Sequence, residues 1–239
     1  MISVAVVGAS GRMGSLAIDL IDADANLKLH AALNSKSDLS QMLGADVVVD
    51  FTLPDVSPKV VEFAVSHGLK IVIGTSGWSE IHLQELRKLL TQHPTAAAVV
   101  IPNFSIGSML AQQFAVQAAK YFDSIEIVEA HHAGKVDSPS GTAVSTAERI
   151  GKVRDQDVQA PHADQRARGQ LVAGVPVHSL RMEGVVAKQD VIFGGNGETV
   201  TITHTTLSDR SYEAGIMAAI RALPGLSGKI VGLDRVINL

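Results

Sequence analysis

Cysteine is absent from the 239-residue sequence, which excludes disulfides, thiolate nucleophiles and cysteine-based zinc sites. Aromatic residues are scarce at 4%, but 46% of the chain is hydrophobic, a composition typical of a folded protein. There is no excess of basic charge, because 24 acidic residues outnumber 20 lysines and arginines, so we expect neither nucleic acid nor membrane as a partner. No apolar run has transmembrane length, and no charged leader precedes the first strand. We therefore expect a cytoplasmic protein that acts on a small molecule.

The first hundred residues alternate short apolar strands with segments of helical periodicity. Residues 2–7 form a β-branched run that ends in glycines, and a helical pattern of apolar residues follows. The same unit repeats, with strands expected at 27–33, 47–51, 70–73 and 96–101 and helices near 56–67, 81–90 and 106–122. This alternation predicts an α/β fold in which residues 1–104 form a doubly wound, Rossmann-like dinucleotide-binding domain with a parallel sheet.

Beyond residue 123 the strands cluster instead of alternating with helices. We expect a strand at 124–132, a helix at 139–153, and consecutive antiparallel strands near 177–182, 188–194 and 199–207. Residues 155–175 are polar and lack periodicity, which predicts a mobile loop. Residues 105–210 thus predict a second domain of α+β type with a mostly antiparallel sheet. A helix and a strand in residues 211–239 are expected to complete the first domain.

Three glycines mark the turn between the first strand and its helix. The motif GASGRMG at residues 8–14 has the spacing of a dinucleotide-binding turn. Gly8 permits the sharp turn, Gly11 lets the backbone approach a pyrophosphate, and Gly14 lets the helix pack close to the sheet. A tight turn without a ligand is the alternative, but the strand before the motif and the helix after it favour a cofactor site.

Two further loops are expected at the same edge of the sheet, because each follows a predicted strand. They are GTSGW at residues 74–78 and IPNFS at residues 101–105. Thr75 and Asn103 would offer a hydroxyl and an amide to the nicotinamide end of the cofactor, although turn formation alone is the alternative. The residues expected to bind the cofactor in these loops and in the glycine turn are Gly8, Ala9, Ser10, Gly11, Arg12, Met13, Gly74, Thr75, Ser76, Ile101, Pro102, Asn103 and Phe104.

Cofactor preference depends on the end of the second strand, where NAD-binding sites usually carry an acid for the ribose diol. This sequence has Asn34 there, and a neutral amide can still hydrogen-bond a hydroxyl. Lys36 and Arg12 can attract a 2′-phosphate, although a solvated charge is the alternative for Lys36. We expect Asn34 to contact the cofactor, which is NADH, NADPH or both.

Residues 129–143, EAHHAGKVDSPSGTA, combine two adjacent histidines with a lysine. A metal site is disfavoured, because successive strand residues point to opposite faces and no HExxH spacing is present. Histidine titrates near pH 6.5 and suits acid/base catalysis. One of His131 and His132 could transfer protons while the other binds substrate. Lys135 can hold a carboxylate or donate a proton.

The same stretch continues into a helix start. Ser138 or Ser140 is expected to cap the helix, with Pro139 in its first turn. Gly141 and Thr142 would expose backbone amides there, and a nearby cation would complete a pocket for an anion. A capped surface helix beside solvated histidines is the alternative.

Together these motifs resemble the dihydrodipicolinate reductase family along the whole chain. The resemblance rests on five motifs in the family's order, namely GASGRMG at 8–14, VVDFTLP at 48–54, GTSGW at 74–78, IPNFSIG at 101–107 and EAHHAGKVDSPSGTA at 129–143. Two positions depart from the family's usual pattern. Ser138 replaces an alanine, and Asn34 stands where the family often has an acid.

The resemblance implies an NAD(P)H-dependent reductase of lysine biosynthesis by the diaminopimelate pathway, which converts 4-hydroxy-tetrahydrodipicolinate to tetrahydrodipicolinate with loss of water. It implies His131 as the general acid/base and Lys135 as the proton donor. His132, Gly141 and Thr142 would clamp the cyclic dicarboxylate substrate. It further implies that the second domain forms a homotetramer through its sheet and that the domains close over ligands. From the residues themselves, we expect no metal. Which proton each of His131 and Lys135 delivers stays open.

Three other interpretations compete with this one. A short-chain dehydrogenase or sugar epimerase needs a Tyr-x-x-x-Lys pair, but neither Tyr121 nor Tyr212 has a lysine four residues later. A different Rossmann-type reductase or a non-catalytic nucleotide-sensing domain would also carry the glycine turn. His131 and Lys135 beside an anion pocket disfavour the sensor.

Overall fold

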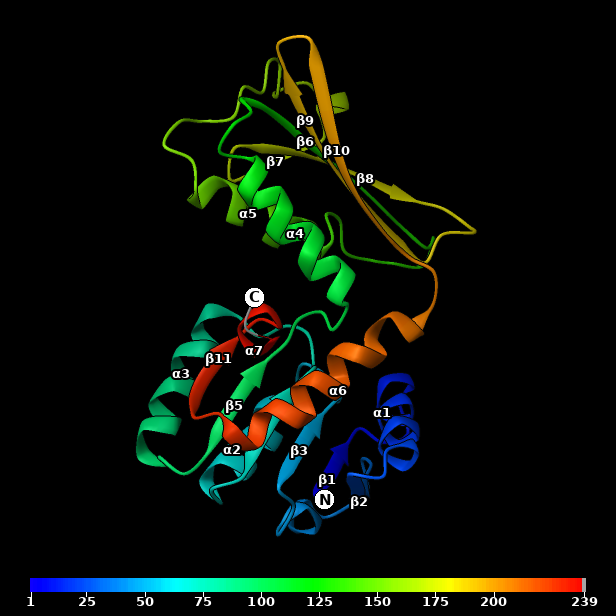
Figure 1. The fold of residues 1–239 in the computed structure, drawn as a ribbon, viewed down its shortest axis with the longest axis vertical. Helices are drawn as coiled ribbons and strands as arrows, with labels where there is room; N and C mark the ends of the chain where they lie inside the picture. Colours follow the sequence, from blue (N-terminus) through cyan, green and yellow to red (C-terminus); the bar gives the residue numbers. More distant parts are fainter. Residues whose placement is uncertain (238–239) are drawn as a thin grey trace. The chain divides into compact units, whose positions relative to one another are not determined.

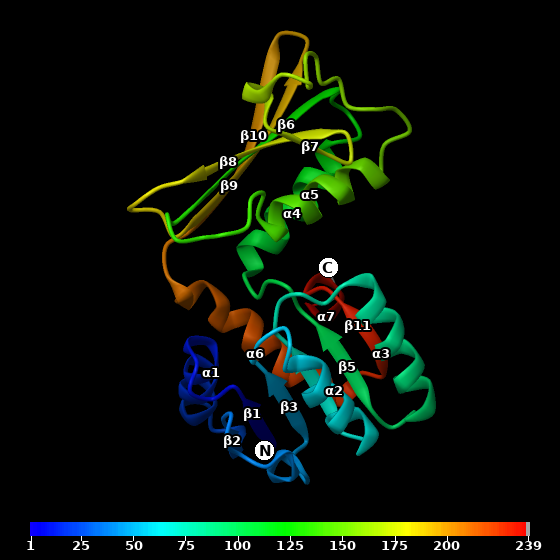
Figure 2. The ribbon, with the colours of Figure 1, turned by 180° about the vertical axis from the view of Figure 1, so that it is seen from behind.

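The computed structural model describes residues 1–237. The last two residues of the strand expected at the C-terminal end, 238 and 239, lie outside the described residues. The described chain divides into two compact units, one comprising Met1–Ile106 and the residues from Tyr212 on, the other Gly107–Ser211 (Figures 1 and 2). They are called unit 1 and unit 2 below. Within residues 1–237, no helix has the length and apolar character that a bilayer span requires.

Unit 1 is built on a six-stranded parallel sheet with the strand order β11-β5-β4-β3-β1-β2. Its strands are β1 (Ile2–Val7), β2 (Leu27–Leu33), β3 (Val47–Asp50), β4 (Lys70–Ile73), β5 (Ala97–Val100) and β11 (Gly228–Val231). The central strands are runs of valine, isoleucine and alanine buried on both faces, as a parallel sheet between two helix layers requires. The predicted doubly wound fold is confirmed.

Helices pack on both faces of this sheet. They are α1 (Arg12–Ala23), α2 (Ser57–Ser66), α3 (Glu80–Gln92), α6 (Glu213–Ala222) and the short α7 (Asp234–Ile237). Helix α2 packs against α3, and α1 packs against α6, so each pair forms part of one layer (Figures 1 and 2). The strand expected from Lys229 to the end of the chain is wrong for residues 232–237, because Gly232 takes a positive φ of 100° and α7 follows.

Unit 2 holds a five-stranded mixed sheet with the order β10-β9-β6-β8-β7. Its strands are β6 (Ser124–His131), β7 (Gln170–Val172), β8 (Val175–Arg181), β9 (Ala187–Gly195) and β10 (Glu198–Thr206), and its helices are α4 (Ile106–Ala118) and α5 (Gly141–Lys152). Three of the four strand pairings are antiparallel. The expectation of consecutive antiparallel strands is wrong for β8 and β9, because β6 lies between them and pairs with β8 in parallel.

Two local features explain this arrangement of unit 2. Ile125 and Ile127 of β6 are fully buried in a core that includes residues of α5, which favours a central position for this strand. The loop expected at 155–175 contains a short edge strand, β7, which pairs with β8 through a two-residue turn. Ala173 and Gly174 both have positive φ in that turn, as tight hairpins require, and Gly174 was the available signal for it, since alanine rarely adopts this conformation.

Candidate functional site

The glycine turn joins β1 to α1 as the motif predicted. A Cβ atom at Gly8 would lie 2.4 Å from the carbonyl oxygen of Phe51, and one at Gly14 would lie 2.2 Å from the carbonyl oxygen of Gly8. Both positions therefore require glycine for backbone packing. Helix α1 begins at Arg12, directly after Gly11, which has no side chain to cap the first turn. The start of α1 thus lacks a side-chain cap, and the N-terminus of a helix is a favourable place for an anionic ligand.

The turn is also fastened to the end of β2. The backbone amides of Gly8 and Ala9 both donate to the carbonyl oxygen of Leu33, each at 2.9 Å. This places the glycine turn beside Asn34, the residue after β2. Other expected cofactor residues of this turn differ in exposure, with Ser10 and Arg12 exposed and Met13 half-buried.

Asn34 forms a turn with its own side chain. Its Oδ1 accepts a hydrogen bond from the backbone amide of Lys36 at 2.9 Å, and its backbone amide donates to Ser37 Oγ at 3.0 Å. Because the side-chain carbonyl stabilises the turn, the Nδ2 group is the part of Asn34 that remains for a ligand. A donor at this position suits a ribose hydroxyl or a phosphate oxygen.

The loops after β4 and β5 lie at the same carboxyl edge, where doubly wound folds bind ligands. Thr75 is only 5% exposed, and its hydroxyl lies 3.1 Å from Asp50 Oδ2. The structure thus directs this hydroxyl to a buried carboxylate, whereas the sequence suggested the cofactor. Gly74 donates its backbone amide to the carbonyl oxygen of Asp50 at 2.9 Å, and Ser76 is exposed.

In the loop after β5, only some of the residues expected to bind the cofactor have exposed side chains. Ile101 and Phe104 are buried, so their side chains serve the core and only their backbone can meet a ligand. The Phe104 ring packs edge-on against Phe51, with centroids 5.5 Å apart. Pro102 is exposed, and Asn103 Oδ1 accepts from the backbone amide of the residue two positions later at 2.9 Å.

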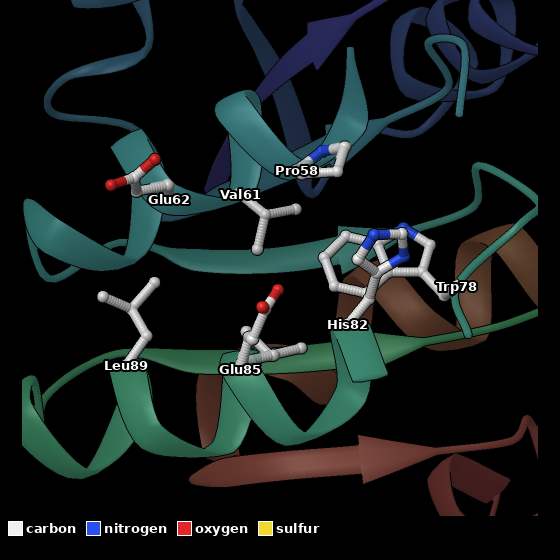
Figure 3. A pocket seen from close by; sticks show the side chains of 8 residues that line it. Pro58, Val61, Glu62, Trp78, His82, Glu85 and Leu89 are labelled. Atoms are coloured by element: carbon white, nitrogen blue, oxygen red, sulfur yellow. The ribbon is translucent and has the colours of Figure 1, made fainter. Parts of the chain in front are cut away.

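Unit 1 also contains a cavity of about 300 Å³ between α2 and α3. Figure 3 shows side chains of the two helices facing each other across it, with Trp78 and His82 at one end. These two rings pack edge to face, 5.8 Å between centroids. None of the residues expected to bind cofactor or substrate lines the cavity, although Trp78 closes the loop that contains Thr75.

The catalytic candidate of unit 2 is the last residue of β6. Nδ1 of His131 lies 2.6 Å from Oε2 of Glu129, two residues earlier on the same face of the strand. Glu129 is fully buried, and Arg181 of β8 pairs with both of its oxygens at 2.9 and 3.0 Å. Sequence reasoning missed Glu129 and Arg181. The E-x-H spacing on one strand was the available signal for the first of them.

These contacts set the charge of the histidine. Burial lowers the pKa of His131, and so do the charges of Lys135 and Arg181, while Glu129 acts in the opposite direction without cancelling the shift. His131 is therefore neutral at neutral pH. Because Nδ1 faces a carboxylate, it carries the proton and donates a hydrogen bond to Glu129, so Nε2 is left as a base.

Glu129 stays ionised in spite of its burial. Burial acts to raise the pKa of this carboxyl group, but hydrogen bonds from Arg181, Ser179, His131 and the backbone of Ser140 lower it below its ordinary value. A buried carboxylate with this many donors is fully paired. It holds the imidazole and the start of α5 at the same time.

Lys135 follows in a turn after β6. Its backbone amide donates to the carbonyl oxygen of His132 at 3.1 Å, and its ammonium group lies 2.6 Å from Asp137 Oδ1. This hydrogen bond lowers the pKa of Asp137. Arg181 Nη2 donates to the carbonyl oxygen of Asp137 at 2.6 Å, which ties the turn to the Glu129 cluster. His132 is exposed.

Helix α5 begins at the expected anion pocket. Its N-cap is Ser140, whose Oγ accepts from the backbone amide of the third helical residue at 3.2 Å. Ser138 is therefore not the cap, and Pro139 precedes the cap instead of lying in the first turn, because the helix starts at Gly141. A Cβ atom at Gly141 would meet no atom within 4 Å, so packing does not require glycine there. The first turn of α5 is thus open to a ligand at Gly141.

The structure thus groups the expected residues into two sets. The glycine turn, Asn34 and the loops after β4 and β5 belong to unit 1, whereas His131, His132, Lys135, Gly141 and Thr142 belong to unit 2. Among residues 1–237, no three histidine, aspartate or glutamate side chains are arranged to hold a metal ion.

Two family models match nearly the whole chain. One, described as dihydrodipicolinate reductase, N-terminus, matches residues 2–104, and the other, described as dihydrodipicolinate reductase, C-terminus, matches residues 107–237. A 4-hydroxy-tetrahydrodipicolinate reductase from Clavibacter michiganensis subsp. michiganensis is 58% identical over 239 residues, covering 99% of this chain and 86% of the relative. The enzyme of the same name from Cutibacterium acnes is 42% identical over 245 residues, with 100% of both chains covered.

A solved structure is similar over the same length. The dipicolinate-bound dihydrodipicolinate reductase from Paenisporosarcina sp. TG-14 has a TM-score of 0.84 and 29% sequence identity, covering 98% of this chain and 99% of that one.

Proposed function

The chain belongs to the dihydrodipicolinate reductase family, which serves lysine biosynthesis, and we propose that His131 and Lys135 carry out the proton transfers of its reaction. The observation that supports this most is the hydrogen bond between His131 Nδ1 and the buried carboxylate of Glu129. A histidine oriented by a carboxylate, with the ammonium group of Lys135 near it, is an arrangement suited to acid/base chemistry.

The substrate of the proposed reaction is 4-hydroxy-tetrahydrodipicolinate, a six-membered cyclic imine with two carboxylates. Elimination removes a ring proton and the hydroxyl group as water and leaves a conjugated imine. The nicotinamide cofactor, when bound, supplies a hydride to this ring. A final proton completes tetrahydrodipicolinate, so the reaction consumes one hydride and one proton and releases one water.

The tautomer of His131 suggests how these protons are divided. Neutral His131 accepts a proton at Nε2, and the carboxylate of Glu129 stabilises the imidazolium that forms. Lys135 is the cation of the pair and donates the proton that is needed on the substrate. We therefore assign the base of the first proton transfer to His131 and the acid to Lys135.

The substrate clamp is proposed at the start of α5. The amides of Gly141 and Thr142 would bind one carboxylate, helped by the positive end of the helix dipole and by His132. The open space over Gly141 supports this assignment. The Paenisporosarcina relative binds dipicolinate, a dicarboxylate of the same ring size, and this supports the substrate class for the present chain.

The cofactor is proposed to lie along the carboxyl edge of unit 1. The backbone cradle at Gly8 and Gly14 and the uncapped start of α1 fit a pyrophosphate. Asn34 presents a donor where an acid is usual, and Lys36 adds a positive charge nearby in sequence. We propose that the chain uses both NADH and NADPH, because neither residue rejects the 2′-phosphate.

The resemblance also supports a homotetramer of cytoplasmic chains. The face of the unit 2 sheet opposite its core carries Leu171 and Leu180, which are 51% and 49% exposed. Apolar side chains on a sheet face are suited to burial in an interface. Light scattering of the purified chain measures the tetramer mass, and Leu180→Asp is expected to reduce it.

The reaction is tested by following NADH or NADPH oxidation with the labile cyclic substrate generated in place from aspartate semialdehyde and pyruvate. We expect turnover with either cofactor. Binding of cofactor without turnover on the dicarboxylate would support a sensor domain and overturn the proposal.

A further inference from the structure

The buried carboxylate of Asp50 has no part in the proton transfers. It connects the loop after β3 with the loop after β4, at the edge where the cofactor is proposed to bind. Asp50 is the last residue of β3 and has no exposed surface. Its Oδ1 accepts from the backbone amide of Thr52 at 3.0 Å and from Thr52 Oγ1 at 2.6 Å. Its Oδ2 accepts from Thr75 Oγ1 at 3.1 Å and from Ser57 Oγ.

These four hydrogen bonds join three segments around Asp50, of which the third is 25 positions away in the sequence. Thr52 lies in the loop after β3, Ser57 is the first residue of α2, and Thr75 lies in the loop after β4. A buried carboxylate is costly unless it is fully hydrogen-bonded, so each of these donors holds the group in place and is held by it.

Ser57 extends the connection to the far end of the loop that contains Thr75. The indole Nε1 of Trp78 donates to Ser57 Oγ at 3.0 Å. The ring of Trp78 also stands at one end of the cavity between α2 and α3 (Figure 3). The loop from Thr75 to Trp78 is thus tied to Asp50 at both ends, once directly and once through Ser57.

The residue after Asp50 continues the connection to the glycine turn. The backbone amide of Phe51 donates to the carbonyl oxygen of Val7 at 2.9 Å. The carbonyl oxygen of Phe51 lies where a Cβ atom at Gly8 would clash. The segment that Asp50 anchors is therefore packed against the turn proposed to bind the pyrophosphate.

We propose that Asp50 is a positioning residue, which fixes the loops after β3 and β4 in the shape that receives the nicotinamide cofactor. The inference rests on the proposed use of this edge by NADH or NADPH. Asp50 acts through Thr52, Thr75 and Ser57, because its own side chain is buried.

The test is Asp50→Asn, which keeps the shape of the side chain but replaces one acceptor oxygen with a donor. We expect the KM for NADPH and NADH to rise about tenfold, the effect of losing one hydrogen bond to a charged group. At saturating cofactor, kcat and the KM for the cyclic imine should stay within about twofold of wild type. Thr75→Val removes a single donor to Asp50 and is expected to act in the same direction, should Asp50→Asn fail to fold.

The matched control is Asp46→Asn. Asp46 precedes the same strand at its other end and accepts from the amide and hydroxyl of Ser3 at 2.8 and 2.9 Å. This change should leave the cofactor KM unaltered. A cofactor KM that is unchanged in both folded Asp50→Asn and Thr75→Val overturns the proposal, and so does an equal rise in Asp46→Asn.

A second readout does not depend on turnover. Trp78 is the only tryptophan in the sequence, so its fluorescence reports on this loop alone. Asp50→Asn should make the indole more accessible to acrylamide quenching, whereas Asp46→Asn should not. If the wild-type chain oxidises neither NADH nor NADPH, the proposed function fails, but the quenching difference still tests the role of Asp50 in the loop. Equal quenching in wild type and folded Asp50→Asn overturns that role.

Discussion

Glu129 and Arg181 form an ion pair through both carboxylate oxygens, at 2.9 and 3.0 Å, and the same carboxylate accepts a hydrogen bond from His131. Arg181 is also the register partner of His131 on the neighbouring strand. The Arg181 guanidinium keeps Glu129 ionised. Its charge also lowers the pKa of His131, which opposes the effect of Glu129 on that pKa. Burial, rather than the carboxylate, therefore decides that the histidine is neutral.

Replacing Glu129 with glutamine should slow the reaction and shift its pH dependence. Glu129 raises the pKa of His131, so its loss moves that already lowered pKa further down. The acid limb of kcat/KM, where His131 becomes protonated, lies below pH 6.5 in wild type and should move to lower pH. We expect kcat to fall on the order of 100-fold, because the imidazolium is no longer stabilised.

The control for this change is Glu126→Gln. Glu126 is on the same strand but the opposite face, and its partners are Arg168 and His178. Its pH profile should match that of wild type. An acid limb in Glu129→Gln that stays at the wild-type position would contradict the assignment of this limb to His131.

His131→Gln and Lys135→Ala should each lose most of the rate while the fold stays intact. General acid/base groups contribute about 10² to 10⁴ in rate, and neither side chain belongs to the hydrophobic core. Steady-state kinetics, with circular dichroism and thermal unfolding as the check on folding, measure this. Wild-type-like kcat in either variant would overturn its assigned role.

Gly141→Ala tests whether the open space at this glycine is needed for the substrate and not for the packing of the protein. The added methyl group meets no atom of the protein, so stability should stay within about 1 kcal/mol of wild type, whereas the KM for the dicarboxylate should rise about tenfold. Thr142→Val should also raise this KM. Gly151→Ala, on the same helix, is the contrast, because its methyl group would lie 2.9 Å from the carbonyl oxygen of Ala173. It should lower the melting temperature and leave the KM alone.

Cofactor choice should respond to the residues after β2. Asn34→Asp supplies the acid that binds a ribose diol and repels a 2′-phosphate, so kcat/KM should fall at least about tenfold for NADPH and hold for NADH. Lys36→Glu should act in the same direction. Strict NADH specificity in wild type, unaltered by Lys36→Glu, would remove the proposal of dual use.

The parts of the site that follow from local patterns were predictable from sequence, and the parts that need distant partners were not. The glycine turn, the strand that ends at His131 and the start of α5 all depend on neighbouring residues. Arg181 approaches Glu129 from 52 positions away, and nothing in its local sequence indicates that contact. Likewise, Thr75 turns to Asp50 because of a buried carboxylate 25 positions earlier, which periodicity does not reveal.

The strand order of unit 1 delays the completion of its sheet during synthesis. Strand β11 forms the edge next to β5, although more than a hundred residues separate them and unit 2 lies within that interval. During synthesis on the ribosome, unit 2 has all of its residues before unit 1 does. A nascent chain that stops before Tyr212 would leave β5 as an open edge, which is prone to pair with other chains. Premature termination should therefore yield aggregation-prone fragments, while unit 2 is free to fold first.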